Sequence, residues 1–145
     1  MANTIPFSFR GALFSGDHNF SNGGDAYRMS LYVTDPYTEN STIYTNTGEV
    51  LTTGGTNYSP FDLVNQTVTA TTNVAAVDWT TDPSWANATF TASFAAIYKY
   101  DAVTAANQLL VVMLDFGGAK TATNGTFTVA FPAVNTAADA IISMS

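Results

Sequence analysis

The sequence contains no cysteine among its 145 residues, and only 10% of those residues are charged. Without cysteine, neither disulfide bonds nor thiolate metal sites can stabilise the fold, which suits a chain that folds in a reducing cytosol. Four basic residues face eleven acidic ones, and the formal net charge is −7 at pH 7. This balance repels a phosphate backbone, so we expect no nucleic-acid partner.

Histidine is nearly absent, since His18 is the only one. A nucleophilic triad needs a base beside its nucleophile, and a zinc site needs several His, Cys or carboxylate ligands at close spacing. The residues around His18 offer neither, so we predict no enzymatic activity, no metal and no cofactor. Calcium is an alternative, because Asp17, Asn19, Asn22 and Asp25 carry oxygen ligands, but their spacing is not that of a helix-loop-helix calcium site.

Long apolar runs are also missing. The longest one covers residues 109–114, whereas a membrane-spanning helix needs roughly 18 apolar residues. The first ten residues lack the basic region and apolar stretch of a secretory signal. We therefore expect a soluble chain without a membrane partner, and its length is usual for one domain.

The polar residues that are abundant, Thr, Asn and Ser, favour strands and tight turns over helices. Alternating or apolar runs predict strands at residues 29–34, 63–71, 74–79, 88–100, 109–116, 126–131 and 140–144. The predicted fold class is all-β: a β-sandwich of about seven or eight strands over residues 26–145, for which a jelly-roll is one available topology. Residues 1–25 show no sustained period and are predicted to form an extended N-terminal arm.

The strand predicted at residues 88–100 has the clearest alternation. One face would carry Phe90, Ala92, Phe94, Ala96, Tyr98 and Tyr100, and the other mainly Thr, Ser and Ala. A helix is the competing interpretation, but aromatic residues at intervals of two and four fit a period of two better than 3.6. We expect a long, half-buried strand.

One motif resembles a phosphate-binding loop without meeting its requirements. Gly117-Gly118-Ala119-Lys120-Thr121 follows an apolar strand, but Met113 stands where the first glycine is needed and no helix is predicted afterwards. We interpret the glycine pair as a hairpin connection after Asp115. A second turn signal, Asn124-Gly125, precedes the next predicted strand.

Acidic and aromatic residues cluster once, where Asp78 precedes Trp79 and Asp82 lies close to Trp85. Sugar hydrolysis needs two carboxyl groups with different pKa values in one cleft, and sugars stack on exposed indole rings. Large aromatic residues in β-domains more often fill the core. The candidate glycan contacts are therefore Trp79 and Trp85, as an alternative to a core role.

Several stretches together resemble small virion structural proteins of tailed bacteriophages, in order over about residues 28–132. They are Met29-Ser30-Leu31-Tyr32, Tyr44-Thr45-Asn46-Thr47-Gly48-Glu49-Val50, Trp85-Ala86-Asn87-Ala88-Thr89-Phe90-Thr91-Ala92, Ala96-Ile97-Tyr98, Leu114-Asp115-Phe116-Gly117 and Thr123-Asn124-Gly125-Thr126-Phe127-Thr128-Val129. The resemblance implies a β-rich, non-enzymatic component of the particle, namely a capsid decoration or cement protein. The implied location is the outer capsid surface, after assembly in the host cytoplasm.

We expect the arm and the exposed strand edges to lie across neighbouring capsid subunits. The candidate contacts on the arm are Phe7, Phe9, Phe14 and Phe20. The expected partners are the major capsid protein and copies of the chain itself, as a dimer or trimer. The alternative is a tail, neck or fibre component that binds host glycans or another virion protein.

Overall fold

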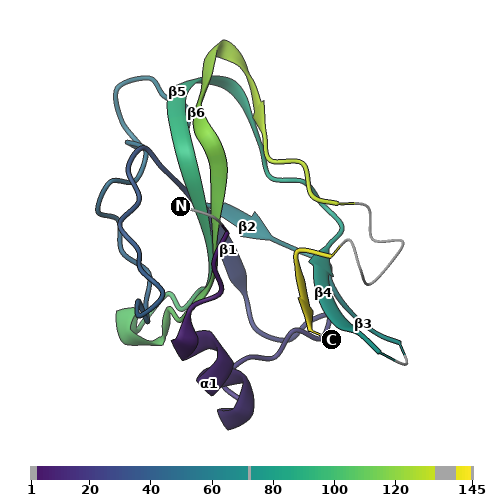
Figure 1. Cartoon of the computed structure of the whole chain (residues 1–145). Helices are drawn as coiled ribbons and strands as arrows, with labels where there is room; N and C mark the ends of the chain where they lie inside the picture. Colours follow the sequence, from purple (N-terminus) through teal and green to yellow (C-terminus); the bar gives the residue numbers. More distant parts are fainter. Residues whose placement is uncertain (1–2, 72, 133–139, 145) are drawn as a thin grey trace.

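The computed structural model describes residues 3–71, 73–132 and 140–144. In this part of the chain the strands are β1 (Tyr27–Tyr32), β2 (Phe61–Leu63), β3 (Gln66–Ala70), β4 (Ala75–Trp79), β5 (Ser84–Lys99), β6 (Leu110–Thr128) and β7 (Ile142–Met144). The helices are α1 (Phe7–Ser15) and the short 3-10 helix η1 (Ala105–Asn107). The strands form two antiparallel sheets, of order β2-β1-β5-β6 and β3-β4-β7 (Figure 1). The β-rich architecture agrees with the all-β prediction, and the C-terminal strand lies at a sheet edge.

The two longest strands, β5 and β6, pair along most of their length and form a bent ribbon. In Figure 1 this ribbon rises away from α1 and bends at the top, and the start of β5 and the end of β6 then descend on the right towards the three-stranded sheet. A register shift accompanies the bend, because Ala92 pairs with Lys120 whereas Phe94 pairs with Asp115. The extra residues of β6 at this point include the glycine pair 117–118, whose φ angles are 69° and 134°. Glycine adopts such angles without strain, so the pair permits a bulge here.

The predicted hairpin at this glycine pair is therefore wrong, since residues 109–116 and 126–131 are not separate strands around a turn. Residues 110–128 form one strand, and the connection between β5 and β6 is the segment that contains η1. Asn124-Gly125 is not a hairpin turn either. Asn124, with φ 49°, lies at another register shift, close to Ala88, which pairs with Gly125. Positive φ angles serve turns and bulges alike, and only the pairing partner distinguishes the two.

The N-terminal segment is not an extended arm, which corrects the prediction. Residues 7–15 form helix α1, which ends at Gly16 in a left-handed conformation with φ 76°. This glycine is a favourable helix end because it has no Cβ. The apolar residues of α1 do not follow a helical period over a sustained face, so the sequence pattern concealed it. Phe9 buries its ring in the main core, which ties the segment to the domain.

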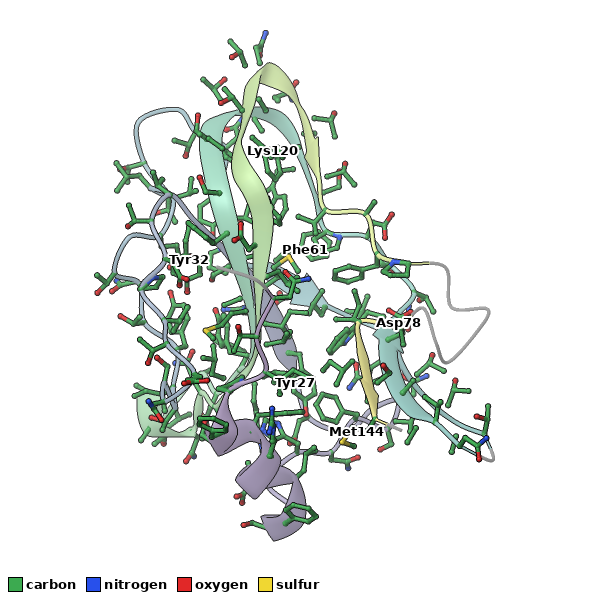
Figure 2. All side chains as sticks on the ribbon, viewed as in Figure 1. Tyr27, Tyr32, Phe61, Asp78, Lys120 and Met144 are labelled. Carbon is green, nitrogen blue, oxygen red and sulfur yellow. The ribbon has the colours of Figure 1, made fainter. Side chains whose placement is uncertain are left out.

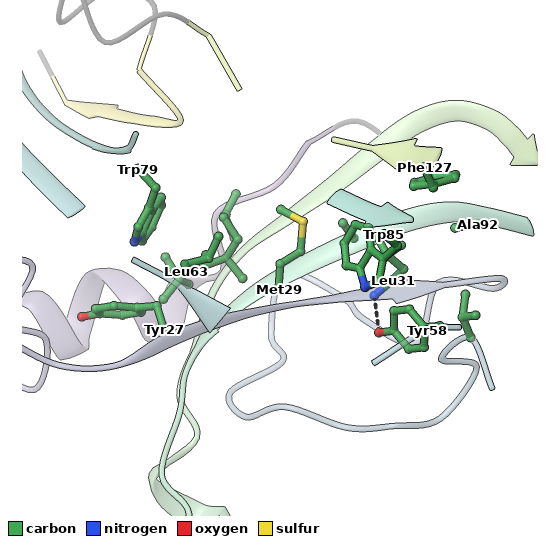
Figure 3. Close-up of a cluster of buried hydrophobic side chains, with 14 of the residues drawn as sticks. Tyr27, Met29, Leu31, Tyr58, Leu63, Trp79, Trp85, Ala92 and Phe127 are labelled. Carbon is green, nitrogen blue, oxygen red and sulfur yellow. Dashed lines mark hydrogen bonds between the residues drawn. The ribbon is translucent and has the colours of Figure 1, made fainter. Parts of the chain in front are cut away.

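The main core lies on one face of the four-stranded sheet and is rich in aromatic side chains (Figure 3). Trp79 of β4 packs against Tyr27 of β1, with ring centroids 5.8 Å apart, and so joins the small sheet to the large one. Trp85, Phe90 and Phe127 pack together inside the bent ribbon. Aromatic contacts of this kind bury large apolar areas and stabilise both halves of the fold.

The two faces of β5 do not remain separate along the strand, contrary to the sequence-based pattern. Ala92 belongs to the main core together with Ala95 and Ile97, whereas Ala96 and Tyr98 belong to a second cluster on the opposite side. Core membership thus changes from even to odd positions beside the register shift. A bulge changes which side chains point to a given face, and a count along the sequence cannot detect it.

The long connection between β1 and β2 is fastened by tyrosine hydroxyls. Glu49 accepts hydrogen bonds from Tyr44 at 2.6 Å and from Tyr58 at 2.7 Å. The Leu31 N–H donates to the Tyr58 hydroxyl oxygen at 2.9 Å (Figure 3). Burial, assisted by the hydrogen bond to Glu49, raises the pKa of Tyr58. These hydroxyls therefore remain protonated donors that hold the loop against β1.

Candidate functional site: a groove beside the distal part of strand β6

The four phenylalanines predicted as contact residues have two different environments. Phe9 and Phe20 are 2% and 7% exposed and belong to the core, so they are not free to contact another protein. Phe7 and Phe14, on α1, are 50% and 95% exposed. The structure therefore leaves Phe7 and Phe14 as surface residues on a packed helix, and the four do not form one contact surface.

The two tryptophans proposed as glycan contacts are buried. Trp79 is 1% exposed and Trp85 is 5% exposed. The Trp85 Nε1–H donates to the carbonyl oxygen of Ser59 at 2.8 Å. A sugar cannot stack on an indole ring whose faces are covered by protein, so this prediction is corrected: both rings fill the core.

The two neighbouring acids, Asp78 and Asp82, serve local backbone groups. Asp78 Oδ1 accepts a hydrogen bond from the Trp79 N–H at 2.8 Å, while its other oxygen is buried without a partner. Burial raises the pKa of Asp78, the hydrogen bond from Trp79 opposes that rise, and the charge of Asp82 adds to it. Asp82 Oδ1 accepts a hydrogen bond from the Phe131 N–H at 2.9 Å. Neither acid lines the groove described below.

The loop weighed as a calcium site already contains a cation. Lys99 Nζ lies 3.1 Å from Asp25 Oδ2 and donates to the carbonyl oxygen of Asp17 at 2.7 Å. His18 stacks against the rings of Phe20 and Tyr27, and burial, with the positive charge of Lys99, lowers the pKa of its imidazole to about 4. Across residues 3–71, 73–132 and 140–144, no three His, Asp or Glu side chains are placed to hold a metal ion.

A groove of about 550 Å³ lies beside β6 in the bent ribbon, and we call it the β6 groove. It is lined by Phe116, Lys120, Thr121, Ala122, Gly125, Thr126, Phe127, Thr128, Val129 and Ala130. Two of the lining rings, Phe116 and Phe127, have centroids 6.3 Å apart. A second cavity of about 280 Å³ shares Phe116, Val129 and Ala130 with the groove and continues towards Ile141. The two therefore form a continuous depression whose lining mixes apolar side chains with threonine hydroxyls and the Lys120 ammonium group.

The outer edge of β6 is covered only in its first part. Thr4 and Met113 exchange two backbone hydrogen bonds of 2.9 Å, and the Asp115 N–H donates to Asn3 Oδ1 at 2.8 Å. Residues 42–44 bridge to the start of the strand. From residue 118 to residue 128, the distal part of β6, no backbone hydrogen bond joins this edge to any other described segment. Unpaired strand edges can accept a further strand.

The opposite side of the ribbon is different in both respects. The edge of β5 is partly covered, because the Thr89 N–H donates to the carbonyl oxygen of Thr56 at 3.1 Å. The outer face carries hydroxyl groups that bond one another, such as Thr91 with Thr121 at 2.7 Å and Ser84 with Thr128 at 3.0 Å. Thr121 and Thr128 also border the β6 groove, so its rim on this face is polar. The groove and the open edge coincide on β6, and not on β5.

Lys120 lies beside this groove, on the part of the ribbon above the body of the molecule (Figure 2). Within the described residues its ammonium group forms no ion pair, whereas Arg28 pairs with Asp62 and Lys99 with Asp25. Sequence reasoning did not identify this site. The alternation of Thr with apolar residues at 121–128 was the available signal, but it was divided between a predicted turn and a predicted strand.

Comparisons with known protein families, with curated protein sequences and with solved structures gave no match. None of the helices in the described residues is long and apolar enough to cross a membrane.

Proposed function

We propose that this protein is a non-enzymatic structural protein of a tailed-bacteriophage particle. In this proposal it acts as a capsid decoration or cement protein, bound to the outer shell across contacts between major capsid subunits. The sequence resemblance supplies the kind of particle. The observation that supports a binding role is the uncovered distal part of β6 beside a groove that contains aromatic rings. An open edge and an adjoining groove together suit an extended segment of another protein.

The surface chemistry also supports a protein partner outside the DNA-filled interior. The net charge of −7 disfavours contact with packaged DNA. The ribbon's outer face is rich in threonine and nearly uncharged, which suits a particle surface in contact with solvent. The two sheets joined at Trp79 support a description of the domain as a sandwich, with jelly-roll topology kept as a prediction. Self-association into a dimer or trimer would follow the symmetry of a shell.

A tail, neck or fibre location is the alternative, with another virion protein bound at the same edge. We no longer propose that such a tail or fibre protein binds host glycans through Trp79 and Trp85, because both indole rings are buried.

Particles from cells that carry the coding sequence would test this proposal. Antibody labelling and electron cryomicroscopy should place the protein at regular positions on the outer shell. Labelling at the tail or neck would support the alternative and reject the capsid role. Recovery of the protein only in the particle-free fraction would reject both virion assignments.

A further inference from the structure

We propose that the β6 groove binds an extended segment of another protein, which adds a strand to the distal part of β6 and carries an acidic residue beside Lys120. This inference deepens the proposed function, since it names the chemistry of the bound partner. It depends on three features: an open strand edge, a groove along that edge lined by aromatic rings as well as polar groups, and a lysine without an ion-pair partner among the described residues.

The open edge selects an extended polypeptide as the partner. Backbone N–H and C=O groups at a strand edge are spaced for another strand, and main-chain hydrogen bonds give such complexes much of their affinity. The protein already uses this mode further along the same edge, where Thr4 pairs with Met113. A bound segment would extend that coverage into residues 118–128.

The groove determines the side-chain pattern of the segment. Lys120 and Ala122 pair with Ala92 and Phe90, which are core residues, so both point towards the concave side of the ribbon. Directly paired residues in antiparallel strands point to the same face. A bound strand would therefore direct every second side chain at this side. Its groove-facing residues should be apolar opposite Phe127 and acidic next to Lys120.

Charge favours a different protein over a second copy of this chain as the occupant. Asp115 is the only acidic residue within β6, and it already takes part in hydrogen bonds near the bulge. A twofold pairing of the distal part with itself would place no acid beside Lys120. A foreign segment with an acid at that position would neutralise it.

Two synthetic peptides test the inference: Thr-Asp-Thr-Val-Thr-Val-Thr-Val and Thr-Val-Thr-Val-Thr-Val-Thr-Asp. They carry the aspartate at opposite ends, because the bound segment can run parallel or antiparallel to β6. Titration into the isotopically labelled full chain, followed by amide NMR shifts, should move residues 118–130 for at least one of them. Replacing the threonine at position 5 of the bound peptide by proline removes a backbone donor, so the affinity should fall by tenfold or more. The absence of localised shifts with both peptides would overturn the inference.

A charge exchange tests the part played by Lys120. The variant Lys120→Glu should weaken binding of the acidic peptide by about threefold and favour a peptide with Lys in place of Asp by a similar factor, as expected for an exposed ion pair. Arg10→Glu makes the same charge change on exposed α1 and serves as the matched control. Equal effects of the two variants would overturn the assignment of Lys120.

The outcomes separate this inference from the proposed function. Peptide binding by a protein that is absent from particles would uphold the groove and reject the virion role. A protein found on the shell that binds neither peptide would uphold the virion role and reject strand addition at β6.

Discussion

Acidification from pH 7 to pH 5 should destabilise this protein through His18, whose imidazole has a lowered pKa in the folded state. The ring stacks against Phe20 and Tyr27, its Nδ1 lies 3.3 Å from the Tyr27 hydroxyl, and its Nε2 is buried without a partner. Burial, with the nearby charge of Lys99, lowers the pKa from 6.5 to about 4. The unfolded chain therefore binds a proton at a higher pH than the folded chain does. The stabilisation that depends on a neutral His18 is present above pH 6.5 and is lost as the pH drops towards 4.

The size of the effect follows from these two pKa values. If the pKa difference of His18 acted in full, the free energy of unfolding would fall by about 2 kcal/mol between pH 7 and pH 5. Part of the ring is exposed, so solvent screening should reduce this loss to about 1 kcal/mol.

Urea unfolding followed by tryptophan fluorescence measures the free energy directly, since both tryptophans are buried in the folded state. His18→Gln retains a neutral polar side chain and should lose about 1 kcal/mol less than the natural protein between pH 7 and pH 5. The comparison is clean because the chain has one histidine, and its carboxyl groups are the same in both proteins. Equal losses in the two proteins would refute the role of His18, whatever their absolute stabilities.

Three further substitutions test the packing described above, each measured by urea unfolding. Asp78→Asn should raise the free energy of unfolding at pH 7, because it removes a buried charge whose pKa is raised in the folded state. The gain should vanish below pH 3.8, where the natural carboxyl is protonated in both states; a gain that does not depend on pH would contradict this reasoning. Gly48→Ala should cost roughly 2–3 kcal/mol, because φ is 74° and the new Cβ would collide with the side-chain hydroxyl and the backbone carbonyl of Thr34. Gly54→Ala, at φ 78° in open space, should cost only about 1 kcal/mol, and equal costs would argue against the close contact. Phe127→Ala should lower the free energy of unfolding by about 3–5 kcal/mol, because it removes a buried ring from the ribbon core. Phe14→Ala, at an exposed ring, should change it by no more than about 0.5 kcal/mol. Similar losses in the two variants would contradict the packing of Phe127 in the core.

Local alternation was sufficient to predict most strand positions. Strand β4 and the long strand β5 lie close to where the pattern placed them, because side chains alternate between faces over any regular strand. Helix α1 escaped prediction because only Phe9 and Leu13 face the core, while its other large apolar residues, Phe7 and Phe14, are exposed. The candidate site escaped prediction for a related reason. An open edge is defined by which segments fail to pair with it, and the sequence does not state its pairing partners.

The sequence by itself determined that this chain is rich in β-strands, has no disulfides and carries threonine on exposed strand faces. Those properties depend on residue type and on neighbours two positions away. The tertiary structure alone decided that Gly117 and Gly118 bend one strand and do not connect two, and that Trp79 and Trp85 are inside. Both outcomes depend on residues distant in sequence: β5 pairs with β6 on each side of the glycine pair, the two sheets meet at Trp79, and Trp85 is covered by rings such as Phe127 within the bent ribbon. Register and burial are properties of the assembled sheets, so a local pattern is compatible with either result.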